Sequence, residues 1–235
     1  MRIRTARNAL TLAAGAIAVL AATITPALLG RSPATPPAHT AAAPETPAPG
    51  AATALSQLEH LTIAAPADAS TYQRSAFGPA WADTDHNGCD QRNDALNRGL
   101  VDVVTKPGTH GCVVLSGTLN DPYTGRVISF HRGPQTSEVV QIDHIVPLAW
   151  AWRQGASTWT AQQREIFATN AINLQAVDGQ ANQAKNDKGP AGWLPPNSAY
   201  RCTYSTRFVE VLATYHLTID PADAHALRDL LTACS

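Results

Sequence analysis

The stretch Glu138–Trp152, EVVQIDHIVPLAWAW, is the part of the sequence that says most about the fold. An apolar run with strand character carries Asp143 and His144 side by side, and Pro147 then breaks it. Neighbouring residues on a strand point to opposite faces, so these two side chains act together only where the strand ends or bends. We therefore expect a strand at 139–145 that ends in a carboxylate and an imidazole, one able to hold a ligand and the other able to transfer a proton.

Two polar segments follow this pair along the chain. The short apolar run AINLQAV, 171–177, predicts a second strand that contains Asn173. The polar run DGQANQAKND, 178–187, predicts a short helix that carries Asn182 and Lys185. Strand, strand and helix thus follow one another, and each carries polar side chains of the kind that bind metal or phosphate.

Periodicity and turn signals predict the other elements. Two β-rich runs flank the turn-forming residues 120–125, which is a hairpin signal. Thr160 with Gln163 three residues later is typical of a helix start. The expected helices are 55–63, 93–104, 148–155, 160–169, 197–215 and 221–233, and the expected hairpin strands are 112–119 and 126–131. The fold class is therefore α+β.

The first 54 residues differ in composition from the rest of the chain. Arg2, Arg4 and Arg7 precede about twenty uncharged residues, a pattern typical of an export signal and long enough for a membrane anchor. We expect residues 1–30 to be a signal peptide or an N-terminal anchor, with membrane contact only if the segment is uncleaved. Residues 31–54 are rich in Pro, Ala and Thr and predict a disordered linker. Residues 55–235 are then one folded domain.

The four cysteines all lie in the exported part of the chain, so two disulfides are expected in an oxidising compartment. Three pairings are possible, and we favour Cys89–Cys112 with Cys202–Cys234 because they close the shortest loops. The net charge of −1 excludes a strongly basic DNA-coating protein. The segment 126–207 nevertheless has eight Lys and Arg against five Asp and Glu, which favours a phosphate-bearing substrate.

The order D-H…N…N-x-x-K resembles the HNH nuclease superfamily. The wider pattern "QIDHIVPLAWAW…NLQAVDG…NQAKND…WLPPN…YRCTY" is similar to a secreted, mostly actinobacterial branch related to the C-terminal domain of GmrSD-type restriction enzymes. The resemblance covers roughly residues 72–234. It implies a ββα-metal core with surrounding helices and an endonuclease that hydrolyses DNA, with RNA as an alternative substrate and little sequence specificity.

The resemblance also implies a role for each motif residue. His144 would be the general base that deprotonates the attacking water. Asp143 and Asn182 would bind one divalent metal ion, and Asn173 would hold the loop that orients His144. Lys185, one turn after Asn182, could reach a phosphate. Many members have His where this chain has Asn182, and an amide oxygen favours Mg²⁺ or Mn²⁺ over softer metals.

A second candidate site lies in DTDHNGCDQRND, residues 83–94. Asp83, Asp85, Asn87 and Asp94 follow the spacing of an EF-hand calcium loop, with Asp at the last position where Glu is usual. The alternative is a polar turn that begins the next helix. Arg92, in the same stretch, is a separate candidate for a phosphate contact.

These observations predict a secreted, monomeric, metal-dependent phosphodiesterase. Two alternatives remain at this point. The first is a non-catalytic extracellular binding module that kept an HNH-like fold and is stabilised by Ca²⁺. The second is a metal-dependent phosphoesterase acting on small phosphate esters or phospholipids.

Overall fold

The computed structural model describes residues 50–235. The expected export segment, and the expected linker up to residue 49, lie outside the described residues. Among residues 50–235, no helix combines the length and the apolar character that a membrane crossing needs. The described part mixes helices with small antiparallel sheets, so the predicted α+β class is confirmed.

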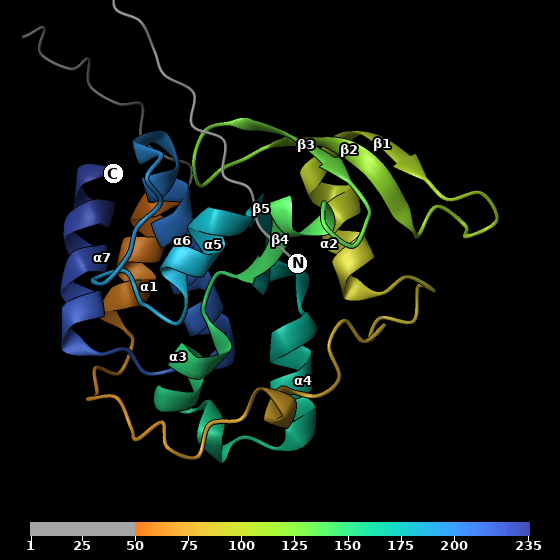
Figure 1. Cartoon of the computed structure of the whole chain (residues 1–235). Coiled ribbons are helices and arrows are strands. Elements are labelled where there is room, and N and C mark those ends of the chain that lie inside the picture. Colours follow the sequence, from red (N-terminus) through yellow and green to blue (C-terminus); the bar gives the residue numbers. More distant parts are fainter. Residues whose placement is uncertain (1–49) are drawn as a thin grey trace, which may run out of the picture. The chain divides into compact units, whose positions relative to one another are not determined.

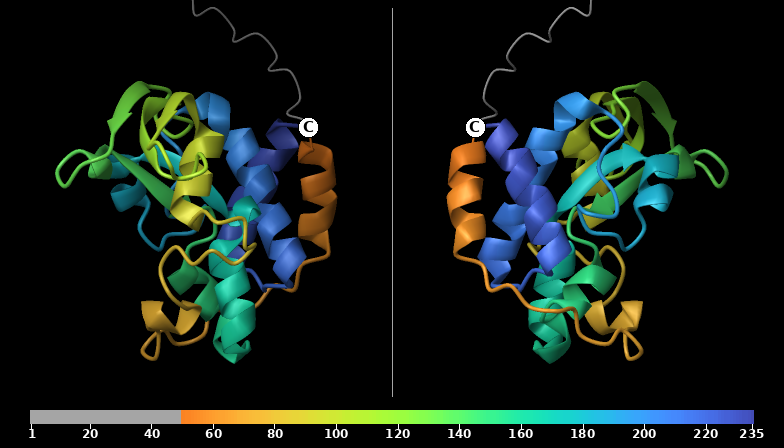
Figure 2. Two further views of the ribbon diagram at one scale, coloured as in Figure 1. Left: turned by 90° about the vertical axis from the view of Figure 1, so that its right-hand side faces the viewer. Right: turned by 90° about the vertical axis from the view of Figure 1, so that its left-hand side faces the viewer.

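Three helices pack together as one layer: α1 (Ala51–Glu59), α6 (Ser198–Tyr215) and α7 (Pro221–Ala233). Figure 2 shows α1 and α7 side by side, on the side away from the green β1–β3 sheet. Asp220 begins α7 as predicted, because its carboxylate accepts the backbone N–H groups of residues 222 and 223. Helix α1 begins at Ala51 rather than 55, because Ala51 and Ala54 are buried; the expected linker therefore ends earlier than 54.

The predicted hairpin forms, and a third strand joins it. Strands β1 (Leu100–Thr105), β2 (Val114–Asn120) and β3 (Val127–His131) pair in the antiparallel order β1-β2-β3. The helix expected at 93–104 is wrong in its second half, because α2 (Gln91–Gly99) stops at Gly99 and β1 follows. Leu100–Thr105 contains three valines, whose branched side chains suit a strand, and its backbone pairs with β2.

A second sheet carries the Asp-His pair. Strand β4 (Val140–His144) pairs antiparallel with β5 (Leu174–Asp178), which places Asp143 opposite Gln175. Helix α5 (Gly179–Lys185) follows β5 directly, and Asp178 caps its start by accepting the N–H of Ala181. Helices α3 (Leu148–Arg153) and α4 (Ala161–Thr169) lie between the two strands along the chain, as predicted (Figure 1). The order β4, β5, α5 is the ββα arrangement expected from the motif.

The remaining elements are short 3-10 turns. They are η1 (Arg74–Phe77), η2 (Ser137–Val139), η3 (Ala156–Thr158) and η4 (Ala171–Asn173). The last of these takes the first three residues of the strand that we expected at 171–177.

Strands β4 and β5 separate two apolar cores. Val177 packs into the larger core, which includes Trp150 and Phe208 and lies among the helices. The neighbouring Ala176 packs into the smaller core beneath the β1–β3 sheet, together with Ile142. Both faces of this two-stranded sheet are thus covered, so polar groups on it must find partners inside the protein.

Two disulfides link segments that are 23 and 32 residues apart in the sequence. Cys89 bonds to Cys112, which ties the segment before α2 to the segment before β2. Cys202 bonds to Cys234, which ties α6 to the end of α7. This is the pairing that closes the two shortest loops.

Candidate active site

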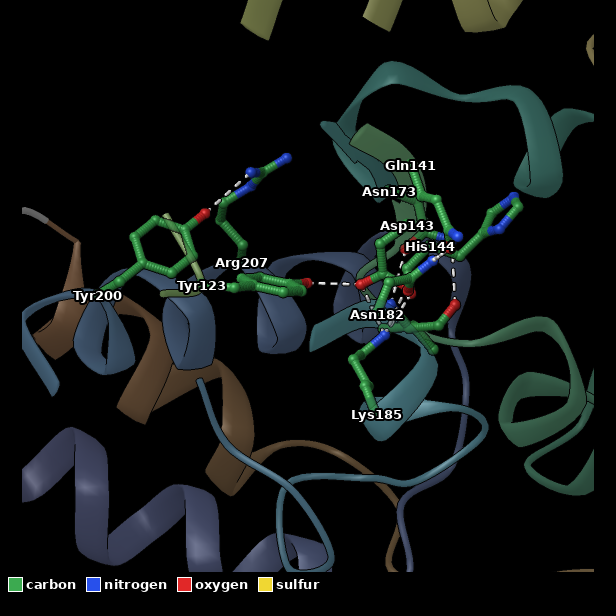
Figure 3. Close-up of polar contacts among 10 residues, drawn as sticks. Tyr123, Gln141, Asp143, His144, Asn173, Asn182, Lys185, Tyr200 and Arg207 are labelled. Carbon is green, nitrogen blue, oxygen red and sulfur yellow. Dashed lines mark hydrogen bonds and ion pairs between the residues drawn. The ribbon is translucent and has the colours of Figure 1, made fainter. Parts of the chain in front are cut away.

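Asp143 lies at the end of β4, and only 5% of its surface is exposed. Its carboxylate accepts hydrogen bonds from Lys185 Nζ at 2.7 and 2.9 Å and from the Tyr123 hydroxyl at 2.5 Å. Figure 3 shows these two side chains meeting Asp143 from different sides. A buried carboxylate costs much free energy unless it is paired and hydrogen-bonded, and here it is both.

Lys185 is fully buried in α5. Besides Asp143, its ammonium donates to the backbone carbonyl of His144 at 2.8 Å. Burial lowers the pKa of Lys185, and the neighbouring Asp143 opposes that change. Because an ammonium has three N–H donors and all have partners inside the protein, the expectation that Lys185 reaches a phosphate does not fit its position.

His144, the last residue of β4, is partly buried. Its Nε2 lies 2.8 Å from the carbonyl oxygen of Ala168. A carbonyl oxygen only accepts, so Nε2 carries the proton and Nδ1 keeps its lone pair. Burial is the main cause that lowers the pKa of His144 to about 4. The imidazole is therefore neutral at pH 7, with one nitrogen free to accept a proton.

Asn173 holds the backbone immediately after His144. The side chain is completely buried; its Oδ1 accepts the N–H of Val146 at 2.8 Å, and its Nδ2 donates to the carbonyl of Val146 at 3.2 Å. The backbone carbonyl of Asn173 also accepts the N–H of Ile145 at 2.9 Å. These contacts fix the course of the chain at the exit from β4, which is the geometry that a loop-holding role requires.

Asn182 lies on α5 and faces β4. Its Nδ2 donates to Gln141 Oε1 at 2.9 Å, which leaves the amide oxygen as the end available to a cation. Asp143, His144 and Asn182 line one cavity of about 250 Å³. A carboxylate and an amide oxygen are the ligand types that Mg²⁺ and Mn²⁺ prefer, and binding of such an ion by this pair stays a prediction. The ammonium of Lys185 offsets the charge that Asp143 offers to such an ion.

The same cavity contains residues that the sequence did not single out. Tyr72 and Arg74 approach from the segment around η1, and Asp187 follows α5. Tyr123, which holds Asp143, comes from the turn between β2 and β3. No local pattern marks these residues, because each reaches the site through tertiary packing.

A larger cavity of about 610 Å³ lies between β3 and α5 and is lined by Arg126, Asp178 and Gln183 among others. Arg126 and Asp178 form an ion pair there at 2.8 Å. No histidine lines this cavity among the described residues. The chemistry of the smaller cavity, rather than its size, therefore makes it the candidate active site.

Arg92 does not line this candidate site. Its guanidinium donates to the backbone carbonyls of Ser137 and Val140, both at 3.3 Å. The structure thus places it at the start of β4, where it ties α2 to the 3-10 turn η2, rather than at the cavity where a phosphate contact would be needed.

The acidic loop at residues 83–94 gathers around Asn87. The amide Nδ2 of Asn87 donates to Asp85 at 3.2 Å and to Asp94 at 3.1 Å, while Asp83 accepts the backbone N–H groups of Asn87 and Gly88. Within residues 50–235, no three His, Cys, Asp or Glu side chains converge as a metal site. Calcium binding by this loop therefore stays a prediction.

Comparisons with known proteins agree with the geometry. The family described as GmrSD restriction endonucleases, C-terminal domain, matches residues 90–230. A protein named "Uncharacterized secreted protein" from Arthroderma benhamiae is 37% identical over 188 residues, which covers 79% of this chain and 87% of that protein. The second match is longer than the range 90–230, so the similarity extends into flanking residues. No solved structure gives a significant match.

Proposed function

Because this chain belongs to the family of GmrSD restriction endonuclease C-terminal domains, a nuclease-related family, we propose that it is a secreted metal-dependent endonuclease that hydrolyses DNA. One observation carries the proposal: a neutral His144 with a free Nδ1 lies in the same cavity as Asp143 and Asn182, the two hard ligands. The three groups suit hydrolysis of a phosphodiester by an activated water.

His144 is the general base in this proposal. Nδ1 takes a proton from water as the water oxygen attacks phosphorus, and the imidazole becomes a cation. The carbonyl of Ala168 holds Nε2–H throughout, so the ring keeps one orientation and one tautomer. Because Asn173 fixes the backbone after β4, the base stays at one position relative to the substrate.

Asp143 and Asn182 would hold the divalent ion, Mg²⁺ or Mn²⁺. A bound ion would offset negative charge on the phosphoryl oxygens and on the leaving 3′ oxygen. Tyr123 and Lys185 position the Asp143 carboxylate. Burial raises the pKa of Tyr123 well above its ordinary value, and Asp143 adds to this effect, so the hydroxyl remains a donor.

An extracellular location is supported by two observations. Both disulfides require an oxidising compartment to persist. The Arthroderma benhamiae relative is named as secreted. Outside the cell the enzyme would meet DNA of any sequence, and we propose low sequence specificity, with RNA as an alternative substrate.

Plasmid degradation by the purified protein, with disulfides intact, tests this function. The assay compares Mg²⁺, Mn²⁺ and EDTA, for the wild type and for His144→Ala. We expect cutting that needs metal and that falls about 10²–10⁴-fold in His144→Ala, the usual contribution of a general base. His225→Ala is the matched control, because His225 lies on α7 with 75% of its side chain exposed, and it should cut like the wild type.

Folded protein that cuts nothing with any metal would contradict the proposal. Cutting that persists in His144→Ala would contradict the assignment of the base while leaving the nuclease activity in place. A chromogenic phosphodiester, tested beside the plasmid, separates a nuclease from a phosphoesterase that acts on small esters.

A further inference from the structure

The segment that contains Tyr72 and Arg74 precedes residues 90–230, the range that matches the family, yet it forms one wall of the candidate active site. Both side chains line the cavity that contains Asp143 and His144. The cavity is therefore incomplete within the family-matched range alone.

This wall is held firmly against the core. Phe77 is completely buried, with ring centroids 6.2 Å from those of Trp152 and Phe167. The guanidinium of Arg164 donates to the carbonyl of Ala76 at 2.8 Å. Tyr72 packs edge-on against Trp152 at 6.0 Å. The backbone on both sides of Arg74 is thus anchored, so its side chain starts from a fixed position at the cavity rim.

Arg74 is the one Lys or Arg side chain that lines this cavity within the described part of the chain. Its side chain is exposed, and no ion pair joins it to another residue between 50 and 235. It lies on the same side of the molecule as the proposed base, because Arg74 and His144 line one cavity. An unpaired guanidinium beside a general base is suited to bind a phosphate through two parallel N–H donors.

The other basic side chains near the site are committed elsewhere. Lys185 is buried on Asp143, and Arg92 donates to backbone carbonyls outside the cavity. Arg126 is paired with Asp178 at the larger cavity. Arg153, which pairs with the cavity residue Asp187, is committed as well. Within residues 50–235, Arg74 is thus the one Lys or Arg lining the smaller cavity that can offer its charge to a ligand there.

We propose that Arg74 binds the phosphate backbone of the nucleic acid substrate next to His144. This inference rests on the proposed nuclease function and names the group that holds its substrate. Arg74 contacts a phosphate that is present before and after cleavage, so its loss should weaken binding more than it slows the chemical step.

Binding of a short fluorescent DNA duplex tests the role of Arg74 apart from turnover. The full-length protein with His144→Ala serves as the parent, so that the duplex stays intact. Adding Arg74→Gln should weaken binding about tenfold, and should reduce the slope of log affinity against log salt by about 0.9, the value for one lost phosphate contact. Arg74→Lys should restore part of the affinity, because it keeps the charge without the planar fork.

Lys106→Gln is the matched control, because it removes one exposed charge from the β1–β2 connection. It should leave affinity and salt slope unchanged. Arg74 is exposed, so Arg74→Gln should unfold at the same urea concentration as the parent.

Two results would overturn the inference, and they differ in whether the proposed nuclease function also fails. If the wild type cuts DNA while, on the His144→Ala parent, Arg74→Gln binds the duplex with the same affinity and salt slope as Lys106→Gln, then Arg74 is not a phosphate ligand and the nuclease function stands. If folded wild type neither cuts nor binds nucleic acid, the proposed function fails and the role of Arg74 fails with it.

Discussion

Two clusters of acidic and amide side chains in this chain have opposite designs. Around Asp143, one buried carboxylate is satisfied by Lys185 and Tyr123, and the partners come from 42 and 20 residues away in the sequence. In the acidic loop, Asp85 and Asp94 meet the exposed amide of Asn87 within a single short stretch. The loop follows a recognisable spacing and can be supported by water. The Asp143 cluster has no local pattern and depends on the fold for every partner. The comparison shows that the spacing of residues in the sequence can locate side chains able to bind a ligand. Burial determines which of these side chains are fixed by hydrogen bonds inside the protein.

The largest expected difference between the two clusters is in stability. Lys185→Met leaves the Asp143 charge buried without its cation, so we expect the free energy of unfolding to fall by about 3–5 kcal/mol, measured by urea denaturation. Lys185→Met combined with Asp143→Leu removes both charges and should recover most of that loss. If Lys185→Met alone were as stable as the wild type, the buried Asp143 carboxylate would depend on its hydrogen-bond partners no more than the exposed carboxylates of the acidic loop do.

Tyr123→Phe sharpens the comparison by removing one hydrogen bond and no charge. The hydroxyl donates to a buried carboxylate, so its loss should lower the free energy of unfolding by about 1.5–3 kcal/mol. Tyr200→Phe is the control, because its hydroxyl accepts a longer bond of 3.3 Å from Arg207 in a partly exposed position. Equal urea midpoints for the two variants would contradict the expectation that the buried Tyr123–Asp143 hydrogen bond contributes more to stability than the Arg207–Tyr200 bond does.

The pH dependence of cutting reports on burial at the same cluster. The pKa of His144 is lowered to about 4, mainly by burial, so the base is unprotonated above that value and becomes protonated as pH falls through it. With saturating metal, the cutting rate should therefore change less than about twofold between pH 7 and pH 5. A base with the ordinary pKa of about 6.5 would lose more than tenfold over that range, and a fall of that size would show an exposed base.

The smallest expected effect lies in the acidic loop. Asp85 is exposed and bonded only to another exposed side chain, so Asp85→Asn in chelator should change the free energy of unfolding by no more than about 0.5 kcal/mol. Thermal unfolding with added Ca²⁺ then tests the loop directly. If Ca²⁺ raises the Tm of the wild type but not that of Asp85→Asn, the acidic loop binds Ca²⁺.

Much of the fold was predictable where local signals are strong. The pair Asp143-His144 at a strand end, Asn173 at the next strand and Asn182 on the following helix were expected, and the structure places them in β4, in the 3-10 turn η4 directly before β5, and in α5. The capping box at Thr160 and the N-cap at Asp220 also marked real helix starts. The strand Leu100–Thr105 was not predicted, because a short apolar run after a helix fits the residue spacing of a helix as well as that of a strand. Its pairing with β2 in the structure identifies it as a strand.

The site was less predictable than the fold. Arg74 and His144 line one cavity although 70 positions separate them in the sequence, and tertiary packing of residues such as Phe77 and Arg164 places Arg74 there. Lys185 was expected to reach a phosphate, but its helix turns it inward to Asp143. Helical spacing in the sequence identifies which residues are neighbours on one helix. It does not tell which face of that helix the rest of the chain covers.

The contact between Lys185 and Asp143 also has a consequence for how the protein matures. The candidate active site needs segments near residues 74, 123, 143 and 185 to meet, so it has no local precursor, and loop-closure entropy opposes these contacts until the chain has folded. An unfolded chain in transit therefore carries the residues of the site without the site itself. A cell that makes this chain would therefore meet the proposed activity only after the whole domain had folded.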